Sequence, residues 1–325
     1  MMNQRIKKTI LGLLGALTAT LVLTACGGKE AAKPEPAKKV DKVSITYVQA
    51  PLNVPSIVEK ANQSFEKKFK EKGIEATYST ITSGADQTAA LASGDIQFLN
   101  CVGGSSVLLS AAGGADIKII SLYSQAPKAF KLFSKDASIK SAQDLKGKTI
   151  AGPKGTILHE LLAAYLQKAG LSMKDVKFVS MGLPNARAAL ENGSADCALL
   201  AGPLAYQSEE KGLHVVTTGE GLVSGLTVTA TSGKFLKEHK DLVDLFLAVQ
   251  KETLTYMKEH EKEALQATMK ATELDEKAVR SMYGLYDFNM TITPEAIASL
   301  KKTQDFLVQS GMMEKKVDVD ALFVK

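Results

Sequence analysis

The sequence predicts an α/β protein with two lobes, each built on a mostly parallel sheet flanked by helices. Three observations favour this class. Segments with strand character alternate with helical segments from Val43 onward, a pattern typical of parallel βαβ units. The same order restarts after Leu145. The chain of 325 residues also exceeds the size at which a single core usually stops growing, about 250–300 residues.

The elements of the first half follow from apolar periodicity and from Gly and Pro signals. The predicted strands are Val43–Val48, Ile74–Ile81 and Ile96–Leu99. The predicted helices run from Asn53 to about Lys72 and from Ser83-Gly84 to Ala92. Asn53 and Ser83 are residue types that cap helix starts, and Pro55 suits a first turn.

The second half repeats this order. Its predicted strands are Thr149–Ala151, Val176–Met181 and Ala195–Leu200, and its helices start at Gly155-Thr156 and at Pro184. Ala90–Gln97 and Ala189–Asp196 share a helix end, a glycine turn and a short buried strand at an offset of 99 residues. This local repeat favours two similar lobes.

The last hundred residues are predicted to be helical and to pack on one of the lobes. The predicted helices are Phe235–Met257, Glu261–Ala271, Glu276–Tyr286 and Pro294–Ser310.

Charge argues against a nucleic-acid partner. The chain has 40 basic and 35 acidic side chains, and three of the bases precede residue 26. The remaining 300 residues carry 37 bases against 35 acids, so no strongly basic surface is expected. The four histidines show no metal-ligand spacing, and we expect neither a metal nor a cofactor.

The N-terminus has the layout of a secretory signal. Three bases, Arg5, Lys7 and Lys8, precede the apolar run Leu11–Leu23, which is shorter than the about 20 residues of a membrane helix. Leu23-Thr24-Ala25-Cys26 resembles a bacterial lipobox, which implies cleavage before Cys26 and lipid attachment to its sulfur. A retained membrane anchor is the alternative.

We therefore divide the N-terminal region into a signal peptide, residues 1–25, and a lipidated Cys26 with a flexible tether, residues 26–42. The tether is rich in Gly, Ala, Pro and charged residues. This predicts export across the inner membrane and anchoring to a membrane, facing the periplasm or the cell exterior.

Small polar residues and glycines gather where the predicted strands end and helices begin. Open α/β sheets bind ligands at these ends, and free N–H groups at helix starts hold anions without a fixed cation. The predicted ligand-binding residues are Pro51, Leu52, Asn53, Ser83, Gly84, Gln87, Asn100, Cys101, Gly155, Thr156, His159, Gly202 and Pro203. No nucleophile–base set is readable, so we predict no catalytic residues and no enzyme.

Several of these residues leave alternatives open. His159 either donates to an oxyanion or is a half-exposed helix residue. Cys101 and Cys197 are interpreted as two buried thiols rather than a disulfide. Asp196 either accepts from a ligand amine or binds backbone N–H groups of a strand that crosses between the lobes and so fixes the hinge, and we favour the second role. Arg187 and Glu191 are four residues apart, so we expect a surface ion pair.

Five phrases in this order resemble the solute-binding proteins of ABC importers, in the branch of aliphatic sulfonate, taurine and nitrate receptors. The phrases are Asp144–Ala151, Lys154-Gly155-Thr156 with His159, Asn185–Gly193 with Asp196, Thr293-Pro294-Glu295, and Val317–Phe323. The resemblance runs from Val43 to the C-terminus. One departure is that Ala201–Tyr206 lacks the Trp-Asp-Pro-Tyr found in many relatives.

This resemblance implies a two-lobe periplasmic-binding-protein fold of type II with the ligand cleft between the lobes. It implies that the chain crosses twice, through strands 130–134 and 226–230, giving lobe one as 43–128 plus 226–325 and lobe two as 129–225. The implied function is capture of a small oxyanion by hinge closure and delivery to ABC permease and ATPase subunits. We expect a monomer.

Two alternatives stay open. A neutral or aromatic ligand, such as a pyrimidine precursor of thiamine, competes with the sulfonate because no arginine is placed securely in the cleft. The related enzyme family that makes the thiamine pyrimidine carries a Cys-rich iron motif, whereas the cysteines here are isolated. A surface lipoprotein with a structural role is a third class, but no repeats or stalks support it.

Overall fold

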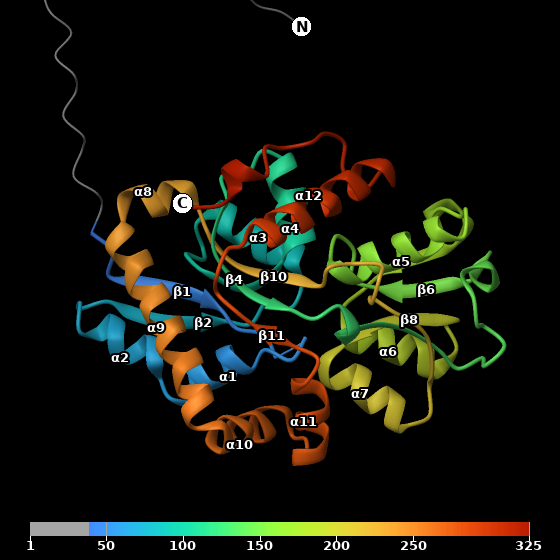
Figure 1. Ribbon diagram of the computed structural model, residues 1–325, viewed down its shortest axis with the longest axis horizontal. Coiled ribbons are helices and arrows are strands. Elements are labelled where there is room, and N and C mark those ends of the chain that lie inside the picture. Colours follow the sequence, from blue (N-terminus) through green and yellow to red (C-terminus); the bar gives the residue numbers. More distant parts are fainter. Residues whose placement is uncertain (1–38, 50, 325) are drawn as a thin grey trace, which may run out of the picture. The chain divides into compact units, whose positions relative to one another are not determined.

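The structure is a computed structural model that describes residues 39–49 and 51–324 (Figure 1). The predicted signal peptide, the predicted lipidation site Cys26 and residues 27–38 of the tether lie outside the described residues. In the part of the chain that is described, no helix is both long and apolar enough to span a membrane.

Two of the three sheets lie on one side of the chain's crossing points. The two-stranded sheet pairs β1 (Lys42–Thr46) with β2 (Glu75–Ser79). The four-stranded sheet has the order β11-β4-β10-β3, formed by β3 (Leu99–Gly103), β4 (Lys118–Gln125), β10 (Leu226–Thr231) and β11 (Asp287–Phe288). A parallel bridge between Ile45 and Phe98 links the two.

Helices cover both faces of these sheets (Figure 1). They are α1 (Val54–Ala61), α2 (Ser64–Lys70), α3 (Gly84–Ser93), α4 (Gly104–Ala112), α8 (Gly233–Glu238), α9 (Lys240–Glu259), α10 (Glu261–Thr272), α11 (Glu276–Tyr283) and α12 (Pro294–Gln309). In the view of Figure 1, α3, α4 and α12 lie above the four-stranded sheet, α1 and α2 lie below it, and α9 runs from α8 at the upper left down to α10 at the bottom. Stacked rings of Phe65, Phe246 and Phe98, with centroids 4.5 and 4.1 Å apart, anchor α2 and α9 to the sheet core.

The five-stranded sheet has the order β7-β6-β8-β5-β9. Its strands are β5 (Phe130–Ser134), β6 (Thr149–Gly152), β7 (Lys177–Ser180), β8 (Cys197–Ala201) and β9 (His214–Thr218). The helices on it are α5 (Ile157–Lys168), α6 (Leu183–Asn192) and α7 (Gly202–Glu210). Four short 3₁₀ turns lie at Pro127–Ala129, Ala142–Leu145, Met173–Asp175 and Asp320–Leu322.

The prediction of mostly parallel sheets is wrong for the four-stranded sheet, where every ladder is antiparallel. The physical reason is the position of β10. This strand returns from the five-stranded sheet and inserts between β3 and β4, which both run the other way. In the five-stranded sheet, β6 is parallel to β7 and β8, and β5 is the reversed strand.

Two predicted helices are each split in two. The helix expected from Asn53 to Lys72 breaks at Gln63, whose left-handed backbone (φ 56°) separates α1 from α2. The helix expected at Phe235–Met257 breaks at His239 (φ −137°), between α8 and α9. After the first break α1 and α2 pack on different apolar clusters, whereas α8 and α9 pack on the same one, and periodicity alone does not encode either arrangement.

The C-terminal helices contact both sheets, contrary to the expectation that they pack on one lobe. Helix α12 lies against α4, and α11 lies against α7. Tyr286 and Phe306 pack on the core of the five-stranded sheet.

The chain passes between the four-stranded and five-stranded sheets at 126–129 and 219–225. We expected strands 130–134 and 226–230 to make the crossings, but each pairs within one sheet. The passages touch each other: the Ala126 N–H donates to the Gly225 carbonyl at 3.2 Å. A Cβ on Gly225 (φ +62°) would lie 2.6 Å from the Pro127 nitrogen, so only glycine fits.

We predict that Gly225→Ala destabilises the protein more than Gly221→Ala. Both glycines have positive φ, which costs alanine about 1–2 kcal/mol, but a Cβ on Gly221 meets nothing within 4 Å. The clash at Gly225 adds about 1–3 kcal/mol of overpacking. Urea unfolding measures both free energies, and equal losses would contradict the role assigned to this contact.

Candidate functional site

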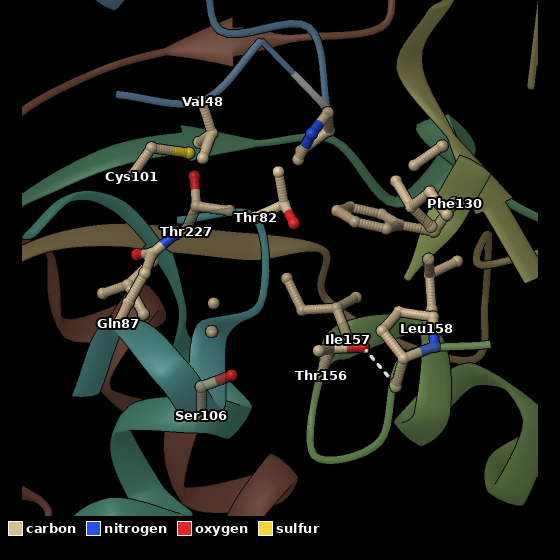
Figure 2. A pocket seen from close by; sticks show the side chains of 17 residues that line it. Val48, Thr82, Gln87, Cys101, Ser106, Phe130, Thr156, Ile157, Leu158 and Thr227 are labelled. Atoms are coloured by element: carbon tan, nitrogen blue, oxygen red, sulfur yellow. Dashed lines mark hydrogen bonds between the residues drawn. The ribbon is translucent and has the colours of Figure 1, made fainter. Parts of the chain in front are cut away.

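A pocket opens where helices from the four-stranded and the five-stranded sheets begin (Figure 2). We call it the central pocket. From the first side it is lined by Val48, Pro51, Thr82, Gly84, Gln87, Cys101, Val102, Gly103, Ser106 and Thr227. From the second side it is lined by Phe130, Pro153, Thr156, Ile157, Leu158, Leu183 and Ala201. Its cavity volume is about 70 Å³.

Among the described residues that line the central pocket, none carries a charged side chain. The polar groups of the pocket wall are instead side-chain hydroxyls, the side-chain amide of Gln87 and backbone groups. Helices α3, α4 and α5 start at the pocket wall, and no described side chain caps the first turn of α4 or α5. Uncapped first-turn N–H groups carry the positive end of the helix dipole, so this wall favours an acceptor or an anion.

Glycine allows the first turns to approach closely. A Cβ on Gly84 would lie 2.3 Å from Ser106 Oγ and 2.9 Å from Ser106 Cβ. The Ser106 hydroxyl donates to the Gly155 carbonyl at 2.8 Å, and so ties α4 to the loop before α5. The start of α3, the start of α4 and the 153–156 loop are thereby held around the same space.

A β-bulge aims Cys101 into the central pocket. Between Asn100 and Val102 the pairing of β3 with β10 skips Cys101, whose φ of 77° is unusual for a non-glycine residue. The thiol donates to Asn53 Oδ1 at 3.1 Å, and burial raises its pKa to about 12. Cys101 is therefore a neutral wall residue rather than a nucleophile. The expectation of two free, buried thiols at Cys101 and Cys197 is confirmed.

Behind the bulge lies a buried polar network. The Asn100 amide donates to Glu59 Oε2 at 2.7 Å and accepts from Gln250 Nε2 at 2.8 Å. Burial raises the pKa of Glu59 to about 8. Asn53 donates to the Val48 carbonyl at 3.0 Å, and the Leu52 N–H donates to the Tyr286 hydroxyl at 3.0 Å. Leu52, Asn53 and Asn100 thus support the wall, and none of them lines the central pocket.

His159 is buried, and it also lies behind the pocket wall. Its Nδ1 accepts from the Gly155 N–H at 3.2 Å, and its ring stacks on Phe178 with centroids 4.5 Å apart. Burial, with a smaller effect from Lys154, lowers the pKa of His159 to about 4, so the ring is neutral at pH 7. A neutral ring that accepts from Gly155 fixes the shape of the 153–156 loop.

The other predicted ligand residues divide between two places. Pro51, Gly84, Gln87, Cys101 and Thr156 line the central pocket. Ser83 and Gly155 line a neighbouring hollow, which also contains Asp86 and Lys154 and which we call the outer hollow. Gly202 (φ +60°) lies against the backbone of Pro51 and Leu52, where a Cβ would come within 3.2 Å, and Pro203 follows it in α7.

Sequence reasoning missed several pocket residues, among them Thr82, Ser106, Phe130, Ile157, Leu158 and Thr227. Ile157 directly follows the predicted binding residue Thr156, and Ser106 lies five residues after the predicted binding residue Cys101. Phe130 and Thr227 lie at the starts of β5 and β10, beside the crossings, and no local signal places strand starts in a pocket.

Two polar residues outside the pocket have internal partners. Asp196 Oδ2 accepts from the Thr149 N–H at 2.7 Å, so the carboxylate holds backbone, but Thr149 belongs to β6, so the expected hold on a crossing strand is wrong. Arg187 pairs with Glu191 at 3.0 Å, and its guanidinium also donates to Gln207. No group of three or more metal-ligating side chains is present in the described part of the chain.

Comparisons with known proteins fit this geometry. Residues 68–264 match the family described as NMT1/THI5 like. The chain belongs to this family. It is 30% identical over 324 residues, 97% of this chain and 96% of the relative, to a Bacillus subtilis (strain 168) protein named as an aliphatic sulfonates-binding protein. It is 29% identical over 214 residues, 65% of each chain, to the taurine-binding periplasmic protein of Escherichia coli (strain K12).

Solved structures confirm the two-lobe fold of periplasmic binding proteins. The alkanesulfonate-binding protein SsuA from Xanthomonas axonopodis pv. citri bound to MOPS superimposes with a TM-score of 0.80 at 22% identity, covering 89% of this chain and 99% of that one. The aliphatic sulphonate binding protein SsuA from Escherichia coli gives 0.72 at 22% identity, covering 88% and 93%. The family's homologues are thus sulfonate- and taurine-binding proteins.

Glu160 forms a buried contact between α5 and the helices of the four-stranded sheet. Its carboxyl accepts from the Ser105 hydroxyl of α4 and from Thr303 of α12. Burial raises the pKa of Glu160 from its usual 4.5 to about 7, and these two hydrogen bonds oppose the shift. The group is therefore neutral in the folded protein at mildly acid pH, when an unfolded chain has already lost the proton.

We predict that Glu160→Gln gains stability relative to the natural protein as pH rises from 4.5 to 7. Glu160 has a raised folded pKa, so its stabilising contribution is present below pH 4.5 and is lost as pH rises through 7. The difference amounts to about 3 kcal/mol over this interval. Urea unfolding at several pH values measures it.

Glu263→Gln, at an exposed position on α10, serves as the control for the change of side chain alone. A pH-independent difference between Glu160→Gln and the natural protein would show that Glu160 ionises normally.

Proposed function

We propose that the protein is the extracytoplasmic solute-binding lipoprotein of an ABC importer and captures a small sulfonate, taurine or nitrate-like oxyanion in the central pocket. The observation that carries the proposal is a buried wall of first-turn backbone groups, from both sheets, without a charged side chain. The named functions of the relatives point to the same ligand class.

Helix starts can hold an oxyanion without a cation. Each first turn offers N–H groups that have no partner within the helix, and the dipoles of α3, α4 and α5 add at the pocket. The Thr156 and Ser106 hydroxyls lie beside these groups. A sulfonate keeps a full charge at all ordinary pH values, so this binding needs no titrating partner.

Apolar side chains beside these first turns suit a short hydrocarbon chain. Phe130, Ile157 and Leu158 (Figure 2), together with Leu183, present apolar surface in the wall of the central pocket. Burial of this surface against a ligand's carbon chain adds affinity in proportion to area.

Residues from both proposed lobes meet the ligand, which gives a physical reason for closure. Lobe one comprises residues 43–128 and 226–325, lobe two comprises 129–225, and the passages 126–129 and 219–225 form the hinge. A ligand that contacts Gly84 and Ser106 of lobe one and Thr156 of lobe two binds the closed form more tightly and shifts the equilibrium toward it. The closed form then docks on the permease, and no bond of the ligand is broken.

The N-terminal segment would determine where this receptor is located. A lipid on Cys26 and the tether that precedes β1 would keep the receptor near the permease; the tether predicted to reach residue 42 is one residue too long, because Lys42 pairs with Glu75 in the sheet. We propose this arrangement from the sequence signals alone, together with a monomeric state.

We predict that a thermal-shift panel on the full chain gives a stabilising shift with short alkyl sulfonates and taurine. A ligand present at 100 times its dissociation constant adds about 2.7 kcal/mol to the free energy of unfolding. Nitrate, thiamine pyrimidines, flavins and amino acids complete the panel. A shift only with a pyrimidine would replace the sulfonate by an aromatic ligand, and no shift in folded, ligand-free protein would count against the receptor role.

We predict that Gly84→Ala weakens sulfonate binding about tenfold or more. The added Cβ displaces Ser106, so the first turns of α3 and α4 separate. Titration calorimetry on the ligand found in the panel gives the affinity. Gly284→Ala is the control, because it has a helical φ of −64° and its Cβ lies 3.7 Å from the nearest atom. Unchanged affinity in Gly84→Ala would show that the first turns of α3 and α4 do not contribute to sulfonate binding.

A further inference from the structure

An acceptor without a partner lies in the wall of the central pocket. Among the described side chains, three buried polar atoms have no hydrogen-bond partner: Glu59 Oε1, Gln87 Oε1 and His214 Nε2. Of these residues, Gln87 is the one that lines the central pocket. Its side chain comes from the first turns of α3 and is 2% exposed.

The orientation of the Gln87 amide follows from its other contact. Its Nε2 donates to the Ile81 carbonyl at 2.8 Å. Exchanging the two ends of the amide would place Oε1 against that carbonyl, and two acceptors repel. The oxygen is therefore the end that is left without a donor.

Neighbouring donors are already engaged. The Cys101 thiol donates to Asn53 Oδ1, and the Thr227 hydroxyl shares a hydrogen bond of 2.7 Å with Ser124. The view of Figure 2 places Gln87 on the side of Cys101 and Ser106, across the pocket from Phe130 and Leu158. A buried acceptor in a pocket wall costs free energy until a donor arrives, and a bound molecule is the available source.

We propose that Gln87 Oε1 accepts a hydrogen bond from a hydroxyl or ammonium group of the ligand, so that the preferred substrates are short sulfonates bearing such a donor rather than plain alkanesulfonates. This inference rests on the proposed function. Gln87 acts as a specificity-determining residue: a ligand with a donor pairs the buried amide oxygen, whereas a ligand without one leaves it unpaired.

Three sulfonates with the same two-carbon chain test the inference on the natural protein: ethanesulfonate, 2-hydroxyethanesulfonate and 2-aminoethanesulfonate. They share the anionic group and differ in the end that meets Gln87. Titration calorimetry at fixed pH and salt gives each dissociation constant. We expect at least one donor-bearing compound to bind about tenfold to a hundredfold more tightly than ethanesulfonate.

The variant Gln87→Met keeps the length of the side chain and removes the acceptor. We expect it to lose the preference and to bind ethanesulfonate at least as well as the natural protein does. Gln309→Met is the matched control, since Gln309 is exposed at the end of α12. If Gln87→Met does not fold, the affinities of the natural protein for the three sulfonates still test the inference.

Equal affinities for the three compounds would overturn the inference while leaving sulfonate binding intact, and would mean that a bound water supplies the donor. A preference for the donor-bearing sulfonates that persists in Gln87→Met would also overturn it, because another residue would then accept the hydrogen bond from the ligand. Failure of all three compounds, with every other sulfonate in the panel, would overturn the inference together with the proposed function.

Discussion

First-turn N–H groups buried at a pocket wall need an acceptor, and much of this structure follows from that requirement. Helices α3, α4 and α5 begin at the same small space, and the described side chains do not cap α4 or α5 there. A backbone donor shielded from water is costly unless it is paired. The pocket wall therefore brings together three helix starts, two of them without a side-chain cap.

Close approach explains which residues stand around the pocket. Glycine at position 84 leaves room for Ser106, and Ser106 in turn holds the carbonyl of Gly155. Neutral His159 accepts from the N–H of the same residue, Gly155. The 153–156 loop is thereby fixed by one donor and one acceptor, neither of which depends on a surface charge that salt would screen.

Two buried carboxyl groups, those of Glu59 and Glu160, lie near the site. Burial raises the pKa of Glu59 to about 8 and that of Glu160 to about 7, so both can remain protonated while the surroundings stay apolar. A neutral acid does not repel an anion bound close by. Cys101, with a thiol pKa of about 12, is likewise neutral. Burial thus disfavours the charged form of both carboxyls, and no charged side chain lines the central pocket among the described residues.

The sequence alone predicted most helices and strands, the two-lobe class and five residues of the pocket wall, because apolar periodicity, helix starts and strand ends are local signals. It could not predict the reversed β10, since insertion between β3 and β4 depends on a chain that has first crossed to another sheet. It likewise placed His159 and Asn100 among ligand residues, where the tertiary structure gives them internal partners. Phe130, Thr227 and the bulge at Cys101 joined the wall only through strand pairing across long stretches of chain, and burial of Gln87 without a donor for its oxygen arose only from that packing.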